Sequence, residues 1–549
     1  MQIIMKKAIK KLLAALLAVA MVCAMAIPAF AYNPGETEED LNTKHEYAAF
    51  QIFTGDVKGN NIDDFKISNA KWGESITNPT EFLAQLTADS TIGGEFKTNF
   101  TPQEAVAVIS KWGDSDDNSI AFARCVCNYL YSNGDPKPVI QGLHTGGIKV
   151  SEPGYYLIVD TSPFDEDDFY HAYNSFLLKV TKAEYVFNIN YKVVKPTVEK
   201  KVYDNDNNDI SSAGNNDGWG SSADHAINEK FQFRLIAKLP ASKDNGRAYD
   251  YYKKYTVCFN DTLSDGITFD KLDKVEIANV DGGNPQVIDA ANYTRTPNGY
   301  QSFKLSIDNV KTCAAAAGLN LNDGATITVT YTAHLNENAT VNTAGGPNTT
   351  DNKNSVFLQY SNNPRIDTSL DHTTTSEVCV YTYQLNNTKY HDDDTPGNEL
   401  AGAGFRLYSD EACTPEQEVK LYKKDNFYYP IKDATDKAQD AVEMFSDEHG
   451  QFNVKGLDAG TYYLKETKTP DDYSPCPDKK IVISATHTEY NVNLSGESNL
   501  NNKIINIKAG GITLPSTGGI GTTLFYVVGG GLMVAAIVLL VTKKRMENK

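Results

Sequence analysis

Short runs of β-branched and aromatic residues, separated by Gly, Asn, Asp and Pro, dominate the chain from Asn188 to Ile507. Examples are FQFRLIA, ATITVTYTAHL, SVFLQY, VCVYTYQL, GFRLY and TYYLKE. Alternating runs of this length, bounded by turn residues, are typical of strands in antiparallel sandwiches. We therefore expect a mainly β fold in this part, built as tandem antiparallel β-sandwiches.

The segment from Glu46 to about Arg124 has a different pattern. It contains two helix-like stretches, PTEFLAQLTA and TPQEAVAVISKW. In the second, Thr101 is placed as the N-cap and Glu104 completes a capping box. Two strand-like runs, GYYLIVDTS and YNSFLLKVT, follow. The first domain is therefore predicted to be mixed α+β.

Both ends of the chain carry export and membrane signals. A lysine-rich start, an apolar run and the small-x-small site AFA predict a secretory signal peptide over residues 1–31, cleaved between Ala31 and Tyr32. Near the other end, the uncharged apolar run 522–541 is followed by KKR, which predicts a transmembrane helix with its basic tail in the cytoplasm. The bulk of the chain is therefore expected outside the membrane.

Charge and cysteine content exclude several classes of protein. The net charge of −19 argues against nucleic acid as a partner, because such binding needs clustered cationic surface. Cys23 leaves with the signal peptide, and the remaining cysteines have neither a disulfide-framework spacing nor a zinc spacing. Cys413 with Cys476 is a candidate disulfide. The acidic stretch DNDNNDISS from Asp204 lacks the EF-hand glycine and closing glutamate, so we expect a hairpin loop there and no metal or cofactor.

Prolines and changes of composition suggest where domains begin and end. Pro196 and Pro364 stand where one set of strands gives way to another, and AGGITLPSTGGIG has the composition of a flexible tether. The predicted division is a signal peptide (1–31), an N-terminal domain (32–194), a second domain (195–375), a third domain (376–508) and a tail (509–549).

The tail contains a sorting motif. Leu514, Pro515, Ser516, Thr517 and Gly518 match LPxTG, and the apolar span and KKR follow directly. This order resembles the cell-wall sorting signal of Gram-positive surface proteins. The resemblance implies that a sortase cysteine attacks the Thr517 carbonyl, expels Gly518 and holds a thioester until an amine resolves it. A cell-wall peptide would give an anchored monomer, whereas a lysine of another copy would give a pilus.

Other stretches resemble Gram-positive backbone pilins. EYAAFQIFTGDVKGN with SNAKWGESI resembles the start of their N-terminal domain. YTVCFNDTLSDGITF, ITVTYTAHLNENATV and NSVFLQYSNNP resemble their second, fimbrial isopeptide-forming domain. LAGAGFRLYSDEA and GQFNVKGLDAGTYYLKETKTPDDYSP resemble a Cna-B, or prealbumin-like, domain. The resemblance implies immunoglobulin-like (Cna-type) sandwiches, with internal isopeptide bonds between Lys and Asn assisted by Asp or Glu.

The residue types of such a bond follow from its chemistry. A lysine amine attacks only when neutral, so burial must lower its pKa, while burial of the assisting carboxyl raises its pKa. Period-two alternation turns Lys200 towards the core with the neighbouring valines and Lys201 outward. Asn354 has the inward parity of its strand, and Asp261 matches the family's acid position. The prediction is Lys200–Asn354 assisted by Asp261.

For the Cna-B-like domain the resemblance points to another set. Glu466 lies in the family's characteristic glutamate segment YYLKETKTP, and Lys389 lies upstream of LAGA. Asn506 fits the asparagine of the terminal strand. If the strand register slips, Asn387 or Asn502 would take its place.

The lysine that joins subunits is predicted from the end of the first domain. Backbone pilins carry a YPK-like motif where this chain reads YVFNINYKVVKP, with Tyr191 and Lys192 but no proline between them. Lys192 is the first candidate and Lys195 the second. The missing proline leaves open whether the subunit forms the shaft or is a basal or accessory pilin.

The resemblance implies a structural subunit of a surface pilus that supports adhesion, and not an enzyme. Its expected partners are a sortase, other pilin subunits and peptidoglycan, with a host surface protein or glycan as a further candidate. It is expected at the cell wall of a Gram-positive bacterium. The alternatives are a basal or accessory pilin, or a monomeric wall-anchored adhesin. A secreted hydrolase is disfavoured because the sequence has neither a nucleophile elbow nor HExxH.

Overall fold

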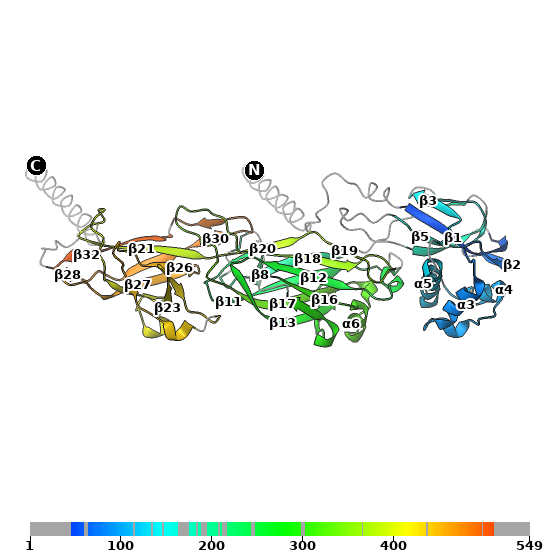
Figure 1. The fold of residues 1–549 in the computed structure, drawn as a ribbon, viewed down its shortest axis with the longest axis horizontal. Helices are drawn as coiled ribbons and strands as arrows, with labels where there is room; N and C mark the ends of the chain where they lie inside the picture. The colour runs from blue at the N-terminus through cyan, green and yellow to red at the C-terminus, as the bar shows by residue number, and fades with distance from the viewer. Residues whose placement is uncertain are drawn as a thin grey trace, which may run out of the picture.

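A computed structural model gives the protein as three units that follow one another along the chain (Figure 1). It describes residues 46–59, 64–113, 116–132, 136–144, 148–162, 175–182, 185–187, 195–206, 209–210, 217–242, 247–297, 302–364, 366–434, 437–496 and 498–509. We call residues 46–187 the first unit, 195–381 the second unit and 383–509 the third unit. Strands predominate in all three, so the mainly β class is confirmed.

The first unit is a sheet covered by helices on one side (Figure 1). Its strands are β1 (Glu46–Lys58), β2 (Lys66–Trp72), β3 (Ile140–His144), β5 (Gly154–Asp160) and β6 (Ser175–Val180), with β4 (Ile148–Val150) and β7 (Tyr185–Phe187) pairing separately. Its helices are α3 (Pro79–Ala88), α4 (Pro102–Ile109) and α5 (Asp117–Ser132). Phe53 of the sheet stacks on Phe122 of α5, with ring centroids 6.4 Å apart. Aromatic burial of this kind joins helix and sheet into one core.

The predicted helix signals are present in this unit. The stretch PTEFLAQLTA is α3. Thr101 caps α4 by accepting from the Glu104 backbone N–H, and the Glu104 carboxylate accepts from the Thr101 backbone N–H at 2.7 Å. The capping box and the mixed α+β character are therefore confirmed.

The second unit is a sandwich of two sheets. One sheet has the order β10-β20-β18-β12-β16-β15, with β19 beside β18, and the other has the order β14-β13-β17-β11-β8-β9. The strands of the first sheet are β10 (Ser222–Asp224), β12 (Val257–Leu263), β15 (Thr294–Pro297), β16 (Ser302–Ile307), β18 (Lys353–Ser361), β19 (Leu370–His372) and β20 (Ser376–Tyr381). Those of the second are β8 (Thr197–Tyr203), β9 (Trp219–Gly220), β11 (Lys230–Leu239), β13 (Ile267–Asn279), β14 (Gln286–Val287) and β17 (Ala325–Leu335), and a short helix α6 (Val310–Ala316) follows β16. Inward residues of both sheets form one apolar core.

The third unit is a second sandwich with a small hairpin. Its sheets have the orders β23-β24-β26-β21-β32-β28 and β25-β22-β27-β29, and β30 pairs with β31. The strands are β21 (Tyr383–His391), β22 (Gly404–Tyr408), β23 (Leu421–Lys424), β24 (Phe427–Pro430), β25 (Met444–Phe445), β26 (Asn453–Leu457), β27 (Gly460–Lys468), β28 (Tyr473–Ser474), β29 (Lys479–Ile483), β30 (Ala485–His487), β31 (Val492–Leu494) and β32 (Asn501–Lys508).

Two features of the sheets differ from the sequence expectation. The sandwiches are not purely antiparallel, because β10 pairs with β20, β21 with β32 and β24 with β26 in parallel. The chain also changes sheet later than residue 375: β20 still pairs with β18 of the second unit, and β21 begins the third unit after Thr382. In the third unit the first and last strands therefore lie side by side and point the same way.

The candidate disulfide between Cys413 and Cys476 is wrong. Neither cysteine forms a disulfide, and no disulfide joins any cysteines of the described residues. Cys413 Sγ faces the Asp478 carboxylate at 3.9 Å, while the backbone N–H of Cys476 is bound by the Glu466 carboxylate at 2.9 Å. These separate contacts hold the two cysteines in different surroundings.

The described residues include no helix that is both long and apolar enough to cross a membrane. The predicted span 522–541 and the signal-peptide cleavage site between Ala31 and Tyr32 lie outside the described residues.

Candidate functional site: buried lysine, carboxyl and asparagine clusters

Four side chains meet inside the second unit, and we call them the second-unit cluster. Lys200 lies on β8, Asp261 on β12, Tyr331 on β17 and Asn354 on β18. β12 and β18 are neighbours in one sheet, and Asp261 pairs with Val356, so Asp261 and Asn354 face the same side of that sheet. β8 and β17 belong to the facing sheet. The cluster therefore lies between the sheets.

A tyrosine hydroxyl joins the members of the second-unit cluster. Lys200 Nζ donates to Asp261 Oδ2 at 2.5 Å and to Tyr331 Oη at 3.3 Å. Tyr331 Oη donates to Asp261 Oδ2 at 3.3 Å and accepts from Asn354 Nδ2 at 2.5 Å. Within the described chain, Asn354 Oδ1 is buried and has no hydrogen-bond partner. The amide, the carboxyl and the amine thus share one contact atom.

Burial sets the protonation of the amine and the carboxyl. The Lys200 residue is 2% exposed, and Asp261 is 1% exposed. Burial lowers the pKa of Lys200 to about 8, although Asp261 opposes this shift. Burial also raises the pKa of Asp261, against the effect of Lys200. Both shifts favour the neutral pair, in which the proton has passed from the amine to the carboxyl.

Aromatic rings line the space around the amine. Lys200 Nζ lies 5.4 Å from the ring centroid of Phe233 and 5.6 Å from that of Tyr331. Phe303 meets the Tyr331 ring edge-on, with centroids 5.2 Å apart. Such walls keep water away from the amine and hold the tyrosine in position. By contrast, Lys201 is turned to the other face of the strand and pairs with Glu199 at 2.9 Å.

Tyr331 was missed by the sequence reasoning. It lies in the run ATITVTYTAHL, where it shares the inward parity of Ile327, Val329 and Ala333. That parity predicts burial, and a buried tyrosine hydroxyl needs a polar partner. The signal was therefore present, but an aromatic residue on an inward strand position reads equally well as simple core packing.

The third unit holds a comparable set: Lys389, Glu466 and Asn506, here called the third-unit cluster. Lys389 lies on β21, the first strand, and Asn506 on β32, the last strand. The strands pair in parallel with Lys389 opposite Ile504, so the Lys389 and Asn506 side chains face the same side. Glu466 lies on β27 of the other sheet.

The contacts distinguish Asn506 from the two alternative asparagines. Asn506 Nδ2 donates to Glu466 Oε1 at 2.7 Å, and within the described residues Asn506 Oδ1 is buried without a hydrogen-bond partner. Asn502 Nδ2 instead donates to Asn387 Oδ1 at 3.1 Å, and Asn387 Nδ2 donates to the Phe452 carbonyl at 3.1 Å. Asn387 and Asn502 thus contact each other, and it is Asn506 that meets the carboxylate.

Lys389 is fully buried in the third-unit cluster. Its Nζ donates to the backbone carbonyls of Tyr390 and Ile504, each at 3.3 Å. Burial lowers the pKa of Lys389 to about 8, partly offset by Cys476 and Glu466. This lysine therefore also has an amine that becomes neutral near physiological pH.

Of the lysines proposed to join subunits and the residues of the sorting motif, the structure describes one. Lys195 is half-buried at the start of the second unit. Lys192 and the five residues of the sorting motif lie outside the described residues.

Comparison with known families identifies the C-terminal third of the chain. Residues 386–498 match the family described as a prealbumin-like fold domain. Residues 506–548 match the LPXTG cell wall anchor motif. The chain is therefore an LPXTG-anchored Gram-positive surface protein with a prealbumin-like domain. The motif makes it a substrate of sortase, which attaches such chains to peptidoglycan. No curated protein sequence matches the chain significantly.

Several solved structures match the chain at low sequence identity. One is the T6 backbone pilin of serotype M6 Streptococcus pyogenes, with 15% identity, a TM-score of 0.45, and coverage of 85% of this chain and 96% of that chain. Another is the full-length major pilin SpaD from Corynebacterium diphtheriae, with 18% identity, a TM-score of 0.37, and coverage of 68% and 81%. A third is the 35 kDa C-terminal fragment of the major pilin GBS80 of Streptococcus agalactiae, with 19% identity, a TM-score of 0.38, and coverage of 57% and 99%.

Proposed function

We propose that the protein is a structural subunit of a sortase-assembled pilus, polymerised and wall-anchored by covalent bonds and stiffened by internal Lys–Asn isopeptide bonds. The observation that carries this proposal is the pair of buried lysine, carboxyl and asparagine clusters in successive β units of a chain that ends in a sorting motif. The domain order would be an N-terminal pilin domain, an isopeptide-forming domain and a Cna-B-like domain. Each internal bond would form once in each molecule, and the protein would turn over no separate substrate.

In the second unit the bond would join Lys200 to Asn354. Asp261 takes the proton from the lysine, and the neutral Nζ attacks Cγ of Asn354. The C–Nδ2 bond breaks as one proton passes from Nζ to Nδ2, which leaves as ammonia, so a secondary amide replaces a primary amide and an amine. The short contact between Lys200 Nζ and Asp261 Oδ2, 2.5 Å, supports the first proton transfer. Tyr331, which touches all three groups, would stabilise the oxyanion or relay the proton.

In the third unit the same reaction would join Lys389 to Asn506, with Glu466 as the assisting acid. The hydrogen bond from Asn506 Nδ2 to Glu466 Oε1, at 2.7 Å, supports this assignment because it places the carboxyl at the leaving nitrogen. Proton transfer to that nitrogen is what makes ammonia a competent leaving group. The buried carbonyl contacts of Lys389 Nζ hold the amine beside the terminal strand.

Polymerisation would use the thioester at Thr517. A lysine of the next copy resolves it, and Lys192 is proposed for this role, with Lys195 as the second choice. Either lysine lies between the first and second units. The second and third units would therefore lie between one inter-subunit bond and the next along the pilus. A host protein or glycan remains a candidate partner for adhesion.

The test is the size of the wall-bound protein in cells. After muramidase digestion, immunoblotting should give a ladder of high-mass species that disappears in Lys192→Ala and persists in the matched control Lys58→Ala, an exposed lysine of the first unit. A ladder that survives Lys192→Ala but not Lys195→Ala would move the role to the second lysine. A single band in the unaltered protein would sink the shaft proposal and favour a monomeric adhesin.

A further inference from the structure

A third cluster of polar side chains lies where the second and third units meet. The β30–β31 hairpin of the third unit packs against the second unit through backbone contacts. The Ile210 N–H donates to the His487 carbonyl at 3.0 Å, and the Val492 N–H donates to the Asn348 carbonyl at 2.7 Å. The Tyr381 hydroxyl donates to the Thr488 carbonyl at 3.0 Å. These contacts fix His487 against the second unit.

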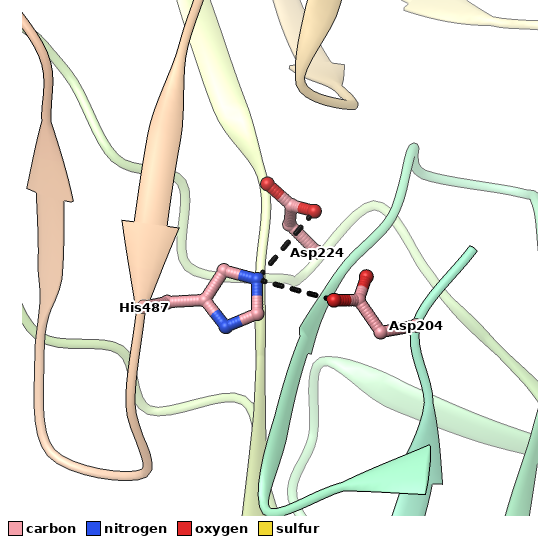
Figure 2. Close-up of side chains that lie close together, drawn as sticks. All are labelled: Asp204, Asp224 and His487. Atoms are coloured by element: carbon pink, nitrogen blue, oxygen red, sulfur yellow. Dashed lines mark ion pairs between the residues drawn. The ribbon is translucent and has the colours of Figure 1, made fainter. Parts of the chain in front are cut away.

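Three side chains converge at this contact, and we call them the junction cluster: Asp204, Asp224 and His487 (Figure 2). Asp204 follows β8 and Asp224 ends β10, both in the second unit, whereas His487 ends β30 of the third unit. His487 Nε2 lies 3.8 Å from Asp204 Oδ2 and 3.6 Å from Asp224 Oδ1. The side chains of Asp224 and His487 are 0% exposed. Both carboxylates thus face one ring nitrogen in a closed space.

Two of the converging atoms have no hydrogen bond. Within the described part of the chain, Asp224 Oδ1 and His487 Nε2 are buried and lack a hydrogen-bond partner. The opposite atoms of the same groups are held: a 2.8 Å hydrogen bond joins His487 Nδ1 to Ser222 Oγ, and Tyr383 Oη donates to Asp224 Oδ2 at 2.7 Å. Outer contacts of this kind orient ligands towards a metal ion. The two atoms without hydrogen bonds are the ones that point at each other.

Further carboxyl groups lie beside the junction cluster. Asp206 shares a side-chain hydrogen bond with Asp204, and Asp209 accepts from the Ser221 N–H at 2.7 Å beside it. Among the described residues, no lysine or arginine forms an ion pair with Asp224. Burial of a carboxylate is costly because desolvation disfavours its charged form, and a bound cation would offset that cost.

We infer that the junction cluster binds one Zn²⁺ ion that bridges the second and third units. His487 Nε2, Asp204 Oδ2 and Asp224 Oδ1 would be the protein ligands, with water completing a four-coordinate shell. Zinc bonds of about 2.0–2.1 Å at tetrahedral angles place donors about 3.3–3.4 Å apart. The separations of 3.6 and 3.8 Å from His487 Nε2 are therefore close to what zinc requires. An imidazole with few oxygens favours zinc over Ca²⁺, which takes six to eight oxygen ligands.

A cleft of about 390 Å³ between the two units is lined in part by Asn205, Glu229 and Asp458. Asn205 is the neighbour of Asp204 in the chain, and its amide Nδ2 lies 3.4 Å from Asp458 Oδ2. Acidic groups that line this cleft would attract a divalent cation to this part of the junction.

The test is titration of the metal-free, full-length protein with Zn²⁺ alone by calorimetry. The unaltered protein should bind one equivalent and melt at a higher temperature with Zn²⁺ than with a chelator. His487→Gln should lose at least tenfold in affinity, whereas His449→Gln, whose side chain is 75% exposed in the same unit, should bind as before. This test is independent of polymerisation and of isopeptide formation.

Two further measurements keep the outcome decisive if His487→Gln disturbs folding. Co²⁺ bound to the unaltered protein should give the visible absorption of a tetrahedral nitrogen and oxygen site, and Asp224→Asn should lose the Zn²⁺-induced rise in melting temperature. Absence of a one-equivalent Zn²⁺ site, a site kept in both variants, or binding of Ca²⁺ without Zn²⁺ would each overturn the inference. The cluster would then be a buried imidazolium ion pair or an oxygen-ligated site.

Discussion

Removing the proposed nucleophile of the second unit gives the sharpest test of the internal bonds. Lys200→Met keeps the length and apolar stem of the side chain but has no amine. The carboxyl of Asp261 left behind is buried, and its pKa is already raised by that burial, so it becomes protonated rather than remaining as an isolated charge. The main loss should therefore be the covalent bond itself. Lys201→Met on the same strand, where Lys201 pairs with Glu199, is the matched control.

The size of the loss follows from the loop that the bond closes. The chain from Lys200 to Asn354 spans about 155 residues, and a crosslink over such a loop stabilises by about 5 kcal/mol in the chain-entropy account. With an unfolding entropy of about 2.1 cal/mol/K per residue, the melting temperature of the second unit should fall by roughly 10–15 °C. The third unit, with its own bond, should melt as before and serves as an internal reference.

The assay combines intact mass with differential scanning calorimetry on the full-length chain. Lys200→Met should retain one more ammonia than the unaltered protein, about 17 Da beyond the substitution itself. Asn354→Ala keeps the lysine–carboxyl pair but has no amide to attack, so it should also lose one ammonia fewer from its sequence mass than the unaltered protein and show a similar fall in melting temperature. If the unaltered protein has its unmodified mass, or if Lys201→Met lowers the melting temperature as much as Lys200→Met, the reasoning is refuted.

Two other predictions concern the geometry of the clusters. Tyr331→Phe removes the hydroxyl that contacts the amine, the carboxyl and the amide. It should slow formation of the Lys200–Asn354 bond by about 10²-fold, the usual effect of losing one transition-state donor. A time course of intact mass that matches the unaltered protein would exclude this role of the hydroxyl. Asn506→Ala should lack the crosslink of the third unit, so it should lose one ammonia fewer from its sequence mass than Asn502→Ala does. In Asn506→Ala, Lys389 stays an amine with a folded pKa of about 8, below the usual value near 10.4, so the unfolded chain binds more protons between these pH values. Stability of the third unit should therefore rise with pH there relative to Asn502→Ala, by at most about 1.4 kcal/mol per pH unit; a fall measured by denaturant titration would contradict the burial argument.

Local signals made much of the fold predictable from the sequence. The Thr101 and Glu104 pair acts within one helical turn, so its capping box needs no tertiary information. Strand alternation likewise places Lys200 inside, because the side-chain period of a strand is fixed by backbone geometry. Pairing between distant strands is different. The parallel contact of β21 with β32 depends on the closure of the whole third unit, and alternation says nothing about the direction of a neighbour.

The junction cluster marks the limit of sequence reasoning more clearly. The calcium-loop pattern, with which the acidic stretch from Asp204 can be compared, takes its ligands from one short stretch of chain. In the structure, Asp204 instead meets Asp224 from a neighbouring strand and His487 from another unit. No spacing rule relates residues so far apart. Only the packing of β30 against the second unit brings the histidine to the two carboxylates.

The positions of the proposed bonds determine which part of the chain would bear load in a pilus. A stretching force applied on the N-terminal side of Lys200 would pass through the Lys200–Asn354 bond and then along the chain to Lys389. From there it would pass through the Lys389–Asn506 bond towards the sorting motif. The stretches 201–353 and 390–505 would then be bypassed, since covalent bonds hold their ends. The load-bearing remainder is 354–389, which contains the change of sheet at Thr382.

Thr382, where the chain changes sheet, is hydrogen-bonded to both the second and the third unit. Thr382 is fully buried, its hydroxyl donates to the Leu457 carbonyl at 3.1 Å, and its own carbonyl accepts from the Asn342 N–H at 2.8 Å. Its neighbours Tyr381 and Tyr383 contact Thr488 and Asp224, the surroundings of the junction cluster. A metal ion between Asp224 and the third unit would therefore resist bending in the stretch between the two isopeptide bonds, which neither of them spans. The covalent bonds and the proposed zinc site would thus protect successive parts of a single load path.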